Sequence, residues 1–408
     1  MAQMPSGEPA PTHGLLPVGI SFDAERSFHA YVHVPFCRVR CGYCDFNTYT
    51  ATELRGVSQD SFARELIAEV EFSRHVLQKS GAPNRKLSTV FFGGGTPTQL
   101  PANDLVAILS ALRTAFGIDE DAEITTEANP DNVDFQYLKE LKAGGFTRVS
   151  FGMQSAVPEV LRVLDRSHQP EKLPEVVAWA KAAGLQTSVD LIYGAPGETI
   201  EQWKITLAAT LALDTDHISA YSLIVEEGTK LARQISSGQL PEPDEDEQAI
   251  KYELADTAFA AAGFSWYELS NWSKHPETIS RHNVAYWQGK DWWGYGPGAH
   301  SHIGGVRWWN QKHPAPYVAA LGRGESPALA REVLAPQTVL DEAVLLEMRL
   351  KSGLEIEKLR QAEGFDASKV AGLIADGLIE PGPALRGRLV LTLRGRLLAD
   401  LVVRELLA

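Results

Sequence analysis

Cysteine is scarce in this sequence. The chain has three cysteines among 408 residues, and all of them lie within eight positions, at Cys37, Cys41 and Cys44. The odd number and the short spacings exclude a disulfide framework, because two good bridges cannot form within so short a loop. Clustered, reduced thiols are typical of the cytoplasm, and we expect a cytoplasmic protein.

Basic charge and long apolar runs are also lacking. The chain has 52 acidic and 38 basic residues, which gives a formal net charge of −14. Nucleic-acid binding needs a basic face, so we do not expect nucleic acid as a partner. No apolar run approaches the ~20 residues of a membrane helix. Residues 1–14 lack the basic and apolar regions of a secretory signal. The remaining composition is that of a globular protein of two or three domains.

The three cysteines follow a short apolar strand with the spacing C-x3-C-x2-C. Thiolates packed so closely can bind one metal centre, and a cubane iron–sulfur cluster takes cysteine sulfur at its corners. Three ligands would leave one iron without a protein thiolate, and a reactive metal site needs such an open position. Zinc would require a fourth ligand. His33 is close in sequence, but it belongs to the preceding strand.

Apolar runs alternate with helical patterns from residue 29 to residue 223. We expect strands at 29–34, 87–92, 123–127, 148–152, 186–193 and 217–223, and helices at 59–78, 101–116, 135–143, 170–183 and 201–213. This alternation predicts an α/β fold with parallel βα units. It is compatible with a barrel and with a flavodoxin-like open sheet. In a barrel, reactive residues gather at the carboxyl ends of the strands.

The chain divides into four expected regions. Residues 1–28 are rich in proline and predict a flexible arm, with an ordered strap as the alternative. Residues 29–240 form the α/β core. Residues 241–330 begin with an acidic linker and contain seven of the nine tryptophans. Residues 331–408 combine short helices with an alternating leucine run, which predicts a winged-helix-like α+β domain.

The segments around the cysteines are similar to a known family. Tyr-x-His-x-Pro-Phe-Cys precedes the loop and Tyr-Cys-Asp-Phe ends it. Together with C-x3-C-x2-C they resemble the radical S-adenosylmethionine (SAM) superfamily, in the branch of oxygen-independent coproporphyrinogen oxidases and HemW haem chaperones. The resemblance implies a partial (βα)6 TIM-like barrel and a [4Fe-4S] cluster on Cys37, Cys41 and Cys44. It also implies that SAM binds the open iron and that an electron donor reduces the cluster. One electron from the cluster then cleaves SAM to a 5′-deoxyadenosyl radical.

Residues at the strand ends match the positions that hold SAM in this superfamily. Chemistry supports the match, because arginine pairs with a carboxylate, and Asp or Glu accepts hydrogen bonds from an ammonium or from ribose hydroxyls. Glycines permit close backbone approach. The expected SAM-binding residues are Tyr31, Gly94, Gly95, Thr96, Glu127, Gln154, Arg166 and Asp190. Gly194 and Pro196 resemble a turn beside the adenine.

Two features separate the members of this branch. The oxidases carry a fourth cysteine two residues after the third, where this chain has Phe46. A phenyl ring has no thiol. The chain also carries H-N-x-x-Y-W, which resembles the signature of the HemW chaperones. Its four residues, His282, Asn283, Tyr286 and Trp287, are the candidate haem-binding residues. A neutral imidazole can bind haem iron, although a structural histidine in an aromatic core is the ordinary alternative.

The preferred hypothesis is a haem chaperone that binds haem, the cluster and SAM and transfers haem to an acceptor haemoprotein. A membrane surface or a membrane protein is a further expected contact for haem delivery. The alternative is an oxygen-independent coproporphyrinogen III oxidase, a radical SAM enzyme, which Phe46 argues against. We expect His282→Ala to spare the cluster and SAM sites, on the expectation that position 282 lies beyond the six-strand barrel.

Overall fold

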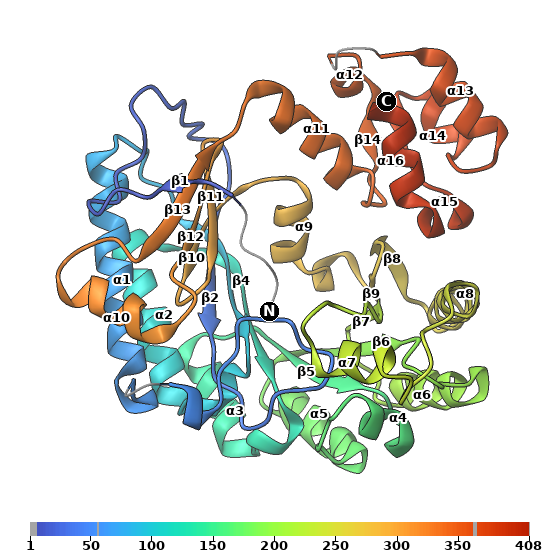
Figure 1. Cartoon of the computed structure of the whole chain (residues 1–408), viewed down its shortest axis with the longest axis horizontal. Helices are drawn as coiled ribbons and strands as arrows, with labels where there is room; N and C mark the ends of the chain where they lie inside the picture. Colours follow the sequence, from blue (N-terminus) through green and yellow to red (C-terminus); the bar gives the residue numbers. More distant parts are fainter. Residues whose placement is uncertain (1–5, 55–56, 362–364, 408) are drawn as a thin grey trace.

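The computed structural model describes residues 6–54, 57–361 and 365–407. Within them, six parallel strands form the centre of the molecule and curve into an open barrel (Figure 1). The strands are β2 (Phe28–Val34), β3 (Leu87–Gly94), β4 (Ile118–Ala128), β5 (Arg148–Gln154), β6 (Gln186–Tyr193) and β7 (His217–Ser222). The predicted α/β fold with a partial barrel is confirmed.

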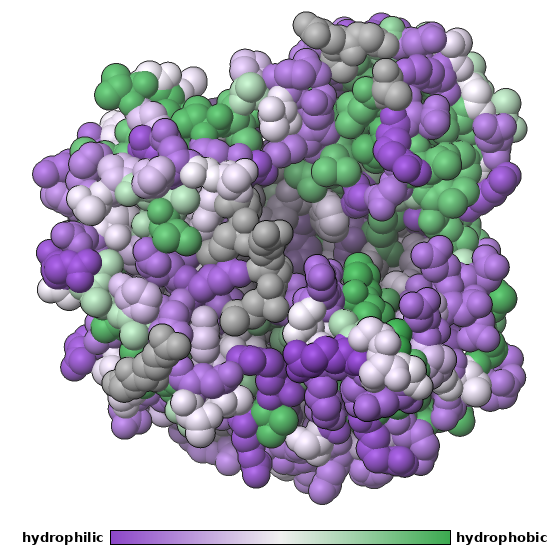
Figure 2. Space-filling view, in the orientation of Figure 1, coloured by the Kyte–Doolittle hydropathy of each residue, from purple (hydrophilic) through white to green (hydrophobic). Residues whose placement is uncertain are grey.

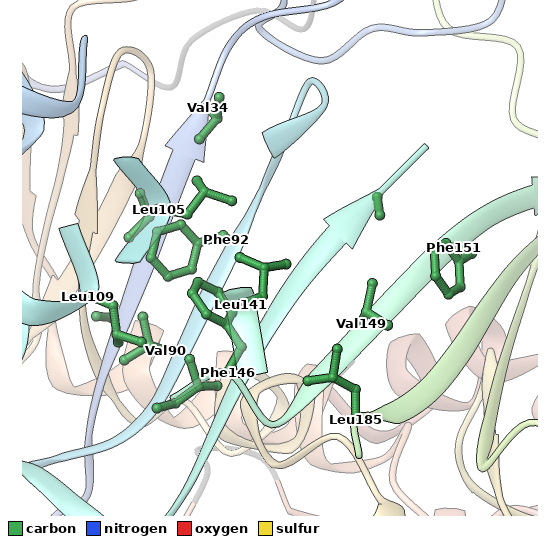
Figure 3. Close-up of a cluster of buried hydrophobic side chains, with 14 of the residues drawn as sticks. Val34, Val90, Phe92, Leu105, Leu109, Leu141, Phe146, Val149, Phe151 and Leu185 are labelled. Atoms are coloured by element: carbon green, nitrogen blue, oxygen red, sulfur yellow. The ribbon is translucent and has the colours of Figure 1, made fainter. Parts of the chain in front are cut away.

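Helices cover the outer face of these strands (Figure 1). They are α1 (Gln59–Lys79), α2 (Ala102–Phe116), α3 (Phe135–Gly144), α5 (Leu173–Ala182) and α6 (Ile200–Ala212). Successive strand residues point to opposite faces, so every second side chain meets these helices. Figure 3 shows the result: Phe92, Phe146 and Leu141 pack with Leu105 and Leu109 in one apolar cluster between sheet and helices.

The inner face of the barrel is polar instead. Thr125, Ser150, Ser188 and Ser219 line the interior, and most of the residues that alternate with them are apolar. Branched apolar side chains usually fill a TIM-type barrel. Small hydroxyl side chains leave much of that volume empty, so this barrel keeps a cavity.

Both edges of the barrel are extended by further strands. They are β8 (Ser265–Glu268), β9 (Asn271–Ser273), β10 (Asp291–Tyr295), β11 (His300–Ile303), β12 (Val306–Asn310), β13 (Ala328–Val333) and β1 (Glu8–Pro9). In the described residues the sheet order is β1-β13-β12-β11-β10-β2-β3-β4-β5-β6-β7-β9-β8. Region 241–330 is therefore joined to the core sheet and is not a segment beside it. Its acidic run starts helix α8 (Glu245–Ala261), where the Asp244 side chain accepts a hydrogen bond from the Glu247 amide.

The N-terminal segment is an ordered strap over residues 6–27, and the expected flexible arm is not what these residues form. Strand β1 pairs antiparallel with β13. Leu16 is buried in the main core, and its amide donates a hydrogen bond to Ser80 Oγ at 3.0 Å. The prolines of this segment restrict its backbone but leave it able to pack as extended chain.

The C-terminal residues form an α+β unit with its own core. Its elements are α11 (Pro336–Glu347), β14 (Leu354–Glu355), α12 (Ile356–Leu359), α13 (Ala367–Ala375), α14 (Pro381–Leu385), β15 (Arg388–Leu389), α15 (Leu393–Leu397) and α16 (Ala399–Leu407). Val344, Leu373 and Val402 lie in a hydrophobic cluster separate from that of the barrel. Among the described residues, no helix combines the length and the apolar character that a bilayer crossing needs.

Candidate functional site

The barrel encloses a cavity of about 650 Å³. Three parts of the chain line it: the cysteine loop after β2, the glycine turn after β3, and polar residues of β4 to β7. The space-filling view is hollowed at its centre, between the barrel and the C-terminal unit (Figure 2). The structure therefore brings the predicted cluster loop and most of the predicted SAM residues to one place.

The cysteine loop is closed by backbone hydrogen bonds. Cys37 N donates to Tyr49 O at 3.1 Å, and Tyr49 N donates to Pro35 O at 2.7 Å. All three thiols are free and partly exposed, and all three line the cavity. Burial raises the pKa of Cys37, and it raises the pKa of Cys44 to about 12. A metal centre would reverse this preference, because its positive charge stabilises thiolates.

The geometry of the loop bears on the choice between a cluster and a single metal ion. In the described part of the chain, no three His, Cys, Asp or Glu side chains are placed to bind one metal ion. His33 is also occupied. Its Nδ1 bonds with Tyr31 OH at 3.0 Å and its Nε2 bonds with Asn47 O at 2.9 Å, while burial lowers its pKa to about 4. Because both ring nitrogens of His33 are hydrogen-bonded within the protein, this histidine does not offer a free fourth ligand to the cysteine loop.

The glycine turn is shaped by its neighbours in the protein. A Cβ on Gly94 would lie 2.5 Å from the His33 ring, and a Cβ on Gly95 would lie 2.6 Å from Phe36 O. Gly94 also has φ +109°, which favours glycine. The Gly95 amide donates to Val34 O, and Thr96 Oγ1 lies 3.9 Å from Cys37 Sγ. The glycines thus fit this turn against the cysteine loop, a reason the sequence did not reveal.

Two half-buried carboxyl groups, those of Glu127 and Asp190, line the cavity. Glu127 receives a hydrogen bond from the Gly94 amide at 3.2 Å, and Asp190 receives one from Ser150 Oγ at 2.8 Å. Burial and the nearby Asp190 raise the pKa of Glu127 to about 8, while the Gly94 hydrogen bond opposes the rise. Burial also raises the pKa of Asp190, against hydrogen bonds from Ser150 and Ser219 and the charge of Arg166. A cation bound between these carboxyls would stabilise their ionised forms.

Gln154 and Arg166 complete the polar wall of the cavity. Gln154 has φ +55°, an uncommon conformation for a residue with a side chain, and its buried Oε1 has no hydrogen-bond partner. Thr125 Oγ1 on the same wall is also unpaired. Arg166 Nη1 lies 3.5 Å from Cys41 Sγ, and its Nη2 donates to Gly152 O at 3.1 Å. Gln154 and Thr125 both line the cavity, and a polar ligand bound there would account for their unpaired atoms.

Tyr31 lies behind this wall. Its ring stacks on Phe91 with centroids 6.4 Å apart, and burial and the nearby Glu127 raise the pKa of its hydroxyl. Phe91 lines the cavity, whereas Tyr31 is not among the lining residues.

The H-N-x-x-Y-W residues lie on helix α9 (Arg281–Trp287), which closes the amino end of the barrel. Glu123 of β4 accepts hydrogen bonds from the amides of Arg281 and His282, at 2.9 and 3.2 Å. His282 Nδ1 bonds with Thr89 Oγ1 of β3 at 2.6 Å. The expectation that position 282 lies beyond the six-strand barrel is therefore wrong, because hydrogen bonds to β3 and β4 hold it inside.

His282 is poorly placed as a ligand in this conformation. It is 1% exposed, its ring stacks on Phe91, and burial holds its pKa well below the usual value. Its Nε2 is buried without a partner. Of the four signature residues, only Asn283 lines the cavity. Tyr286 packs against His282, and Trp287 lies under Arg349. Binding of haem iron by His282 would need helix α9 to move.

Two short helices that the sequence reading missed hold the cysteine loop from outside. They are α4 (Pro158–Val163) and α7 (Lys230–Ser236). The Gly42 amide donates to Leu164 O at 3.1 Å, and the Leu231 amide donates to Gly42 O at 2.9 Å. Proline at the first position of α4 and the Thr229 cap of α7 were available signals.

Comparison with known proteins agrees with this geometry. The Radical SAM superfamily model matches residues 31–209. The structure resembles that of coproporphyrinogen III oxidase from Escherichia coli with a TM-score of 0.79, covering 95% of this chain and 91% of that one. At 24% sequence identity this likeness shows the fold alone. The barrel, the cysteine loop and the polar cavity define a radical SAM protein.

Comparison with protein sequences identifies the family of this chain within the radical SAM superfamily. "Heme chaperone HemW" of Mycobacterium tuberculosis (strain H37Rv) is 46% identical over 382 residues, 93% of this chain and 95% of that protein. "Heme chaperone HemW" of Bacillus subtilis is 31% identical over 91% of this chain and 97% of that protein. The chain belongs to the HemW family of radical SAM proteins.

Proposed function

We propose that this protein is a haem chaperone that carries a [4Fe-4S] cluster and SAM, binds haem and transfers it to acceptor haemoproteins. The observation that carries the proposal is the likeness to proteins named heme chaperones over nearly their whole length. Phe46 supports it, because the chain lacks the fourth thiol of the oxidases. An electron donor for the cluster and an acceptor haemoprotein are the partners that this function requires.

Three thiols and the cavity wall would hold the two resident cofactors. Cys37, Cys41 and Cys44 would bind three irons of the cluster, in a loop fixed by its own backbone hydrogen bonds. Bound together, cluster and SAM supply one-electron chemistry. The chain's part is to position SAM. Glu127 and Asp190 present carboxyls to its cationic groups, and Arg166 presents a guanidinium to its carboxylate. The remaining candidates are Tyr31, Gly94, Gly95, Thr96 and Gln154.

The unpaired atoms of the cavity are consistent with such a ligand. Gln154 Oε1 and Thr125 Oγ1 are buried and lack partners within the protein. Leaving such an atom unpaired costs about 1–3 kcal/mol, which a hydrogen-bonding ligand would recover. The residues present therefore fit a polar, partly cationic molecule.

For haem, the signature residues on α9 remain the candidates from sequence: His282, Asn283, Tyr286 and Trp287. Asn283 lines the cavity, and the other three are packed behind its wall or against the C-terminal unit. Ligation by His282 therefore requires an opened form of α9. Without that opening, His282 is a structural residue whose loss destabilises the barrel.

One anaerobic experiment tests the function. Protein with a reconstituted cluster is offered haem and coproporphyrinogen III in parallel, with SAM and a reductant. We expect about one haem per chain by Soret absorbance, transfer of that haem to an apo-haemoprotein, and no decarboxylation. The triple Cys37→Ala, Cys41→Ala, Cys44→Ala variant should hold no iron–sulfur cluster. Formation of protoporphyrinogen by the unmodified protein, with SAM consumed, would overturn the chaperone proposal.

A further inference from the structure

The mouth of the cavity carries an unusual number of exposed apolar side chains. Ile224 is 68% exposed, Phe46 60%, Val39 54% and Tyr221 41%. All four line the same cavity. Single exposed apolar residues need no explanation, but several around one cavity mark a place where another surface is bound.

These side chains come from the two edges of the open barrel. Val39 and Phe46 lie on the cysteine loop, which follows β2. Tyr221 lies in β7, and Ile224 follows that strand by two residues. Strands β2 and β7 are the first and last of the six parallel strands β2 to β7. The apolar residues therefore come from the chain segments at or after the first and the last of these strands, and all four line the same cavity.

The chemistry of the mouth differs from that of the interior. The same cavity is also lined by the carboxyls of Glu127 and Asp190 and by hydroxyls of the strands. Arg38 is an exposed cation on the cysteine loop, and the exposed carboxylates Asp131 and Glu226 line the same cavity. A ligand suited to this place has a flat apolar face, which aromatic and branched side chains can cover, and an anionic edge. A planar tetrapyrrole with carboxylate side chains has both.

We infer that haem is held at this mouth, with its face against Phe46 and Ile224 and a propionate toward Arg38. The inference rests on the proposed haem-chaperone function and names where the haem sits. It assigns Phe46 a positive role, since the phenyl ring that replaces the oxidase thiol supplies a contact surface. It also removes the need for helix α9 to open, because the mouth is accessible while His282 is buried at the other end of the barrel.

Haem titration of the full chain with its cluster reconstituted tests this assignment. The variants are Phe46→Ala on one side of the mouth and Ile224→Ser on the other, with Phe46→Tyr as the conservative replacement. Both side chains are more than half exposed, so folding should be little affected. We expect Phe46→Ala and Ile224→Ser each to weaken haem binding about tenfold. The Phe46→Tyr variant should bind haem nearly as well as the unmodified protein. Iron content and circular dichroism check that loop and fold are intact.

Leu385→Ser is the matched control, because Leu385 is 90% exposed but lies on α14 of the C-terminal unit. It should leave haem affinity unchanged. If Leu385→Ser weakens binding as much as Phe46→Ala, haem adheres to any exposed apolar residue and the inference fails. If Phe46→Ala and Ile224→Ser both bind like the unmodified protein, the site is elsewhere although the chaperone function stands. If the unmodified protein binds no haem, the function and the site fail together.

Discussion

At the scale of single residues, the cavity contains two carboxyl groups, and burial raises the pKa of each. Glu127 and Asp190 share a cavity wall, and their mutual repulsion adds to the cost of burial for Glu127. The folded pKa of Glu127, about 8, exceeds its ordinary value of 4.5. The free energy of unfolding of the ligand-free protein therefore falls as pH rises from 4.5 to 8, because the unfolded chain ionises Glu127 in this range and the folded chain does not. A bound cation would offset that loss.

The raised pKa of Glu127 predicts that SAM binding releases a proton from this carboxyl. At pH 7 Glu127 is mostly protonated in the free protein, and the cationic groups of SAM would lower its pKa. Affinity for SAM should therefore rise as pH increases toward 8, by at most about tenfold per pH unit. Calorimetry at pH 7 in two buffers of different ionisation enthalpy measures the proton release.

Glu127→Gln should abolish most of that proton release and weaken SAM binding by about ten- to a hundredfold at pH 8. Glu120→Gln, at an exposed position, is the control and should behave like the unmodified protein. Equal proton release in the Glu127 variant would show that this carboxyl does not face the bound SAM.

At the scale of elements, the cysteine loop is held by a part of the chain far away in sequence. Asn47 Nδ2 donates to Pro297 O at 2.9 Å and to Lys312 O at 2.8 Å. These two acceptors follow β10 and β12, strands that only the structure reveals. The tryptophan-rich region therefore holds the end of the cysteine loop in place, and Asn47 is the side chain that joins them.

Asn47→Ala should lower the free energy of unfolding by about 1–3 kcal/mol, because two buried acceptors lose their donor. It should also slow anaerobic cluster assembly and reduce the iron bound per chain, although no thiol is changed. Thermal unfolding and iron analysis measure the two effects. Asn84→Ala, at an exposed position before β3, should alter neither. Normal iron content in a destabilised Asn47 variant would mean that the contact stabilises the fold but does not position the loop.

At the scale of the whole molecule, a buried ion pair joins the C-terminal unit to the barrel. Arg396 contacts Asp256 of helix α8 at 2.8 and 2.7 Å, and its guanidinium lies 4.4 Å above the Trp266 ring. The arginine side chain is 5% exposed and the aspartate 18%. The two units have separate hydrophobic cores, and this ion pair contributes to their coupling together with the packing of Leu393 and Leu397 against the main core.

Arg396→Met should cost about 3 kcal/mol, because it leaves the partly buried Asp256 without its cation. We expect calorimetry to show one unfolding transition for the unmodified protein and two for this variant, with the C-terminal unit melting first. Arg394→Met is the matched control. Arg394 is exposed, and its side chain donates a hydrogen bond to Asp376 O within the C-terminal unit. A single transition in the Arg396 variant would show that other contacts suffice to couple the units.

The sequence alone predicted much of this protein because its signals are local. Strand and helix periodicity placed the six parallel strands within a few residues, since burial on one face repeats along a single element. The cysteine spacing and H-N-x-x-Y-W indicated the family from contiguous residues. Glu127 and Asp190 were selected because they match positions of the family resemblance, which are also read from local sequence.

Tertiary structure decided what depends on residues distant in the chain. The packing of residues 6–27 depends on the pairing of β1 with β13. The extension of the sheet beyond the barrel depends on the pairing of β10 with β2. No local sequence pattern specifies either pairing. The pKa of Glu127 and the burial of His282 follow from neighbours on other strands. The apolar mouth likewise exists only because the curved barrel brings the ends of β2 and β7 to one cavity. Sequence periodicity records which face of an element is buried, whereas only the folded chain determines what lies against it.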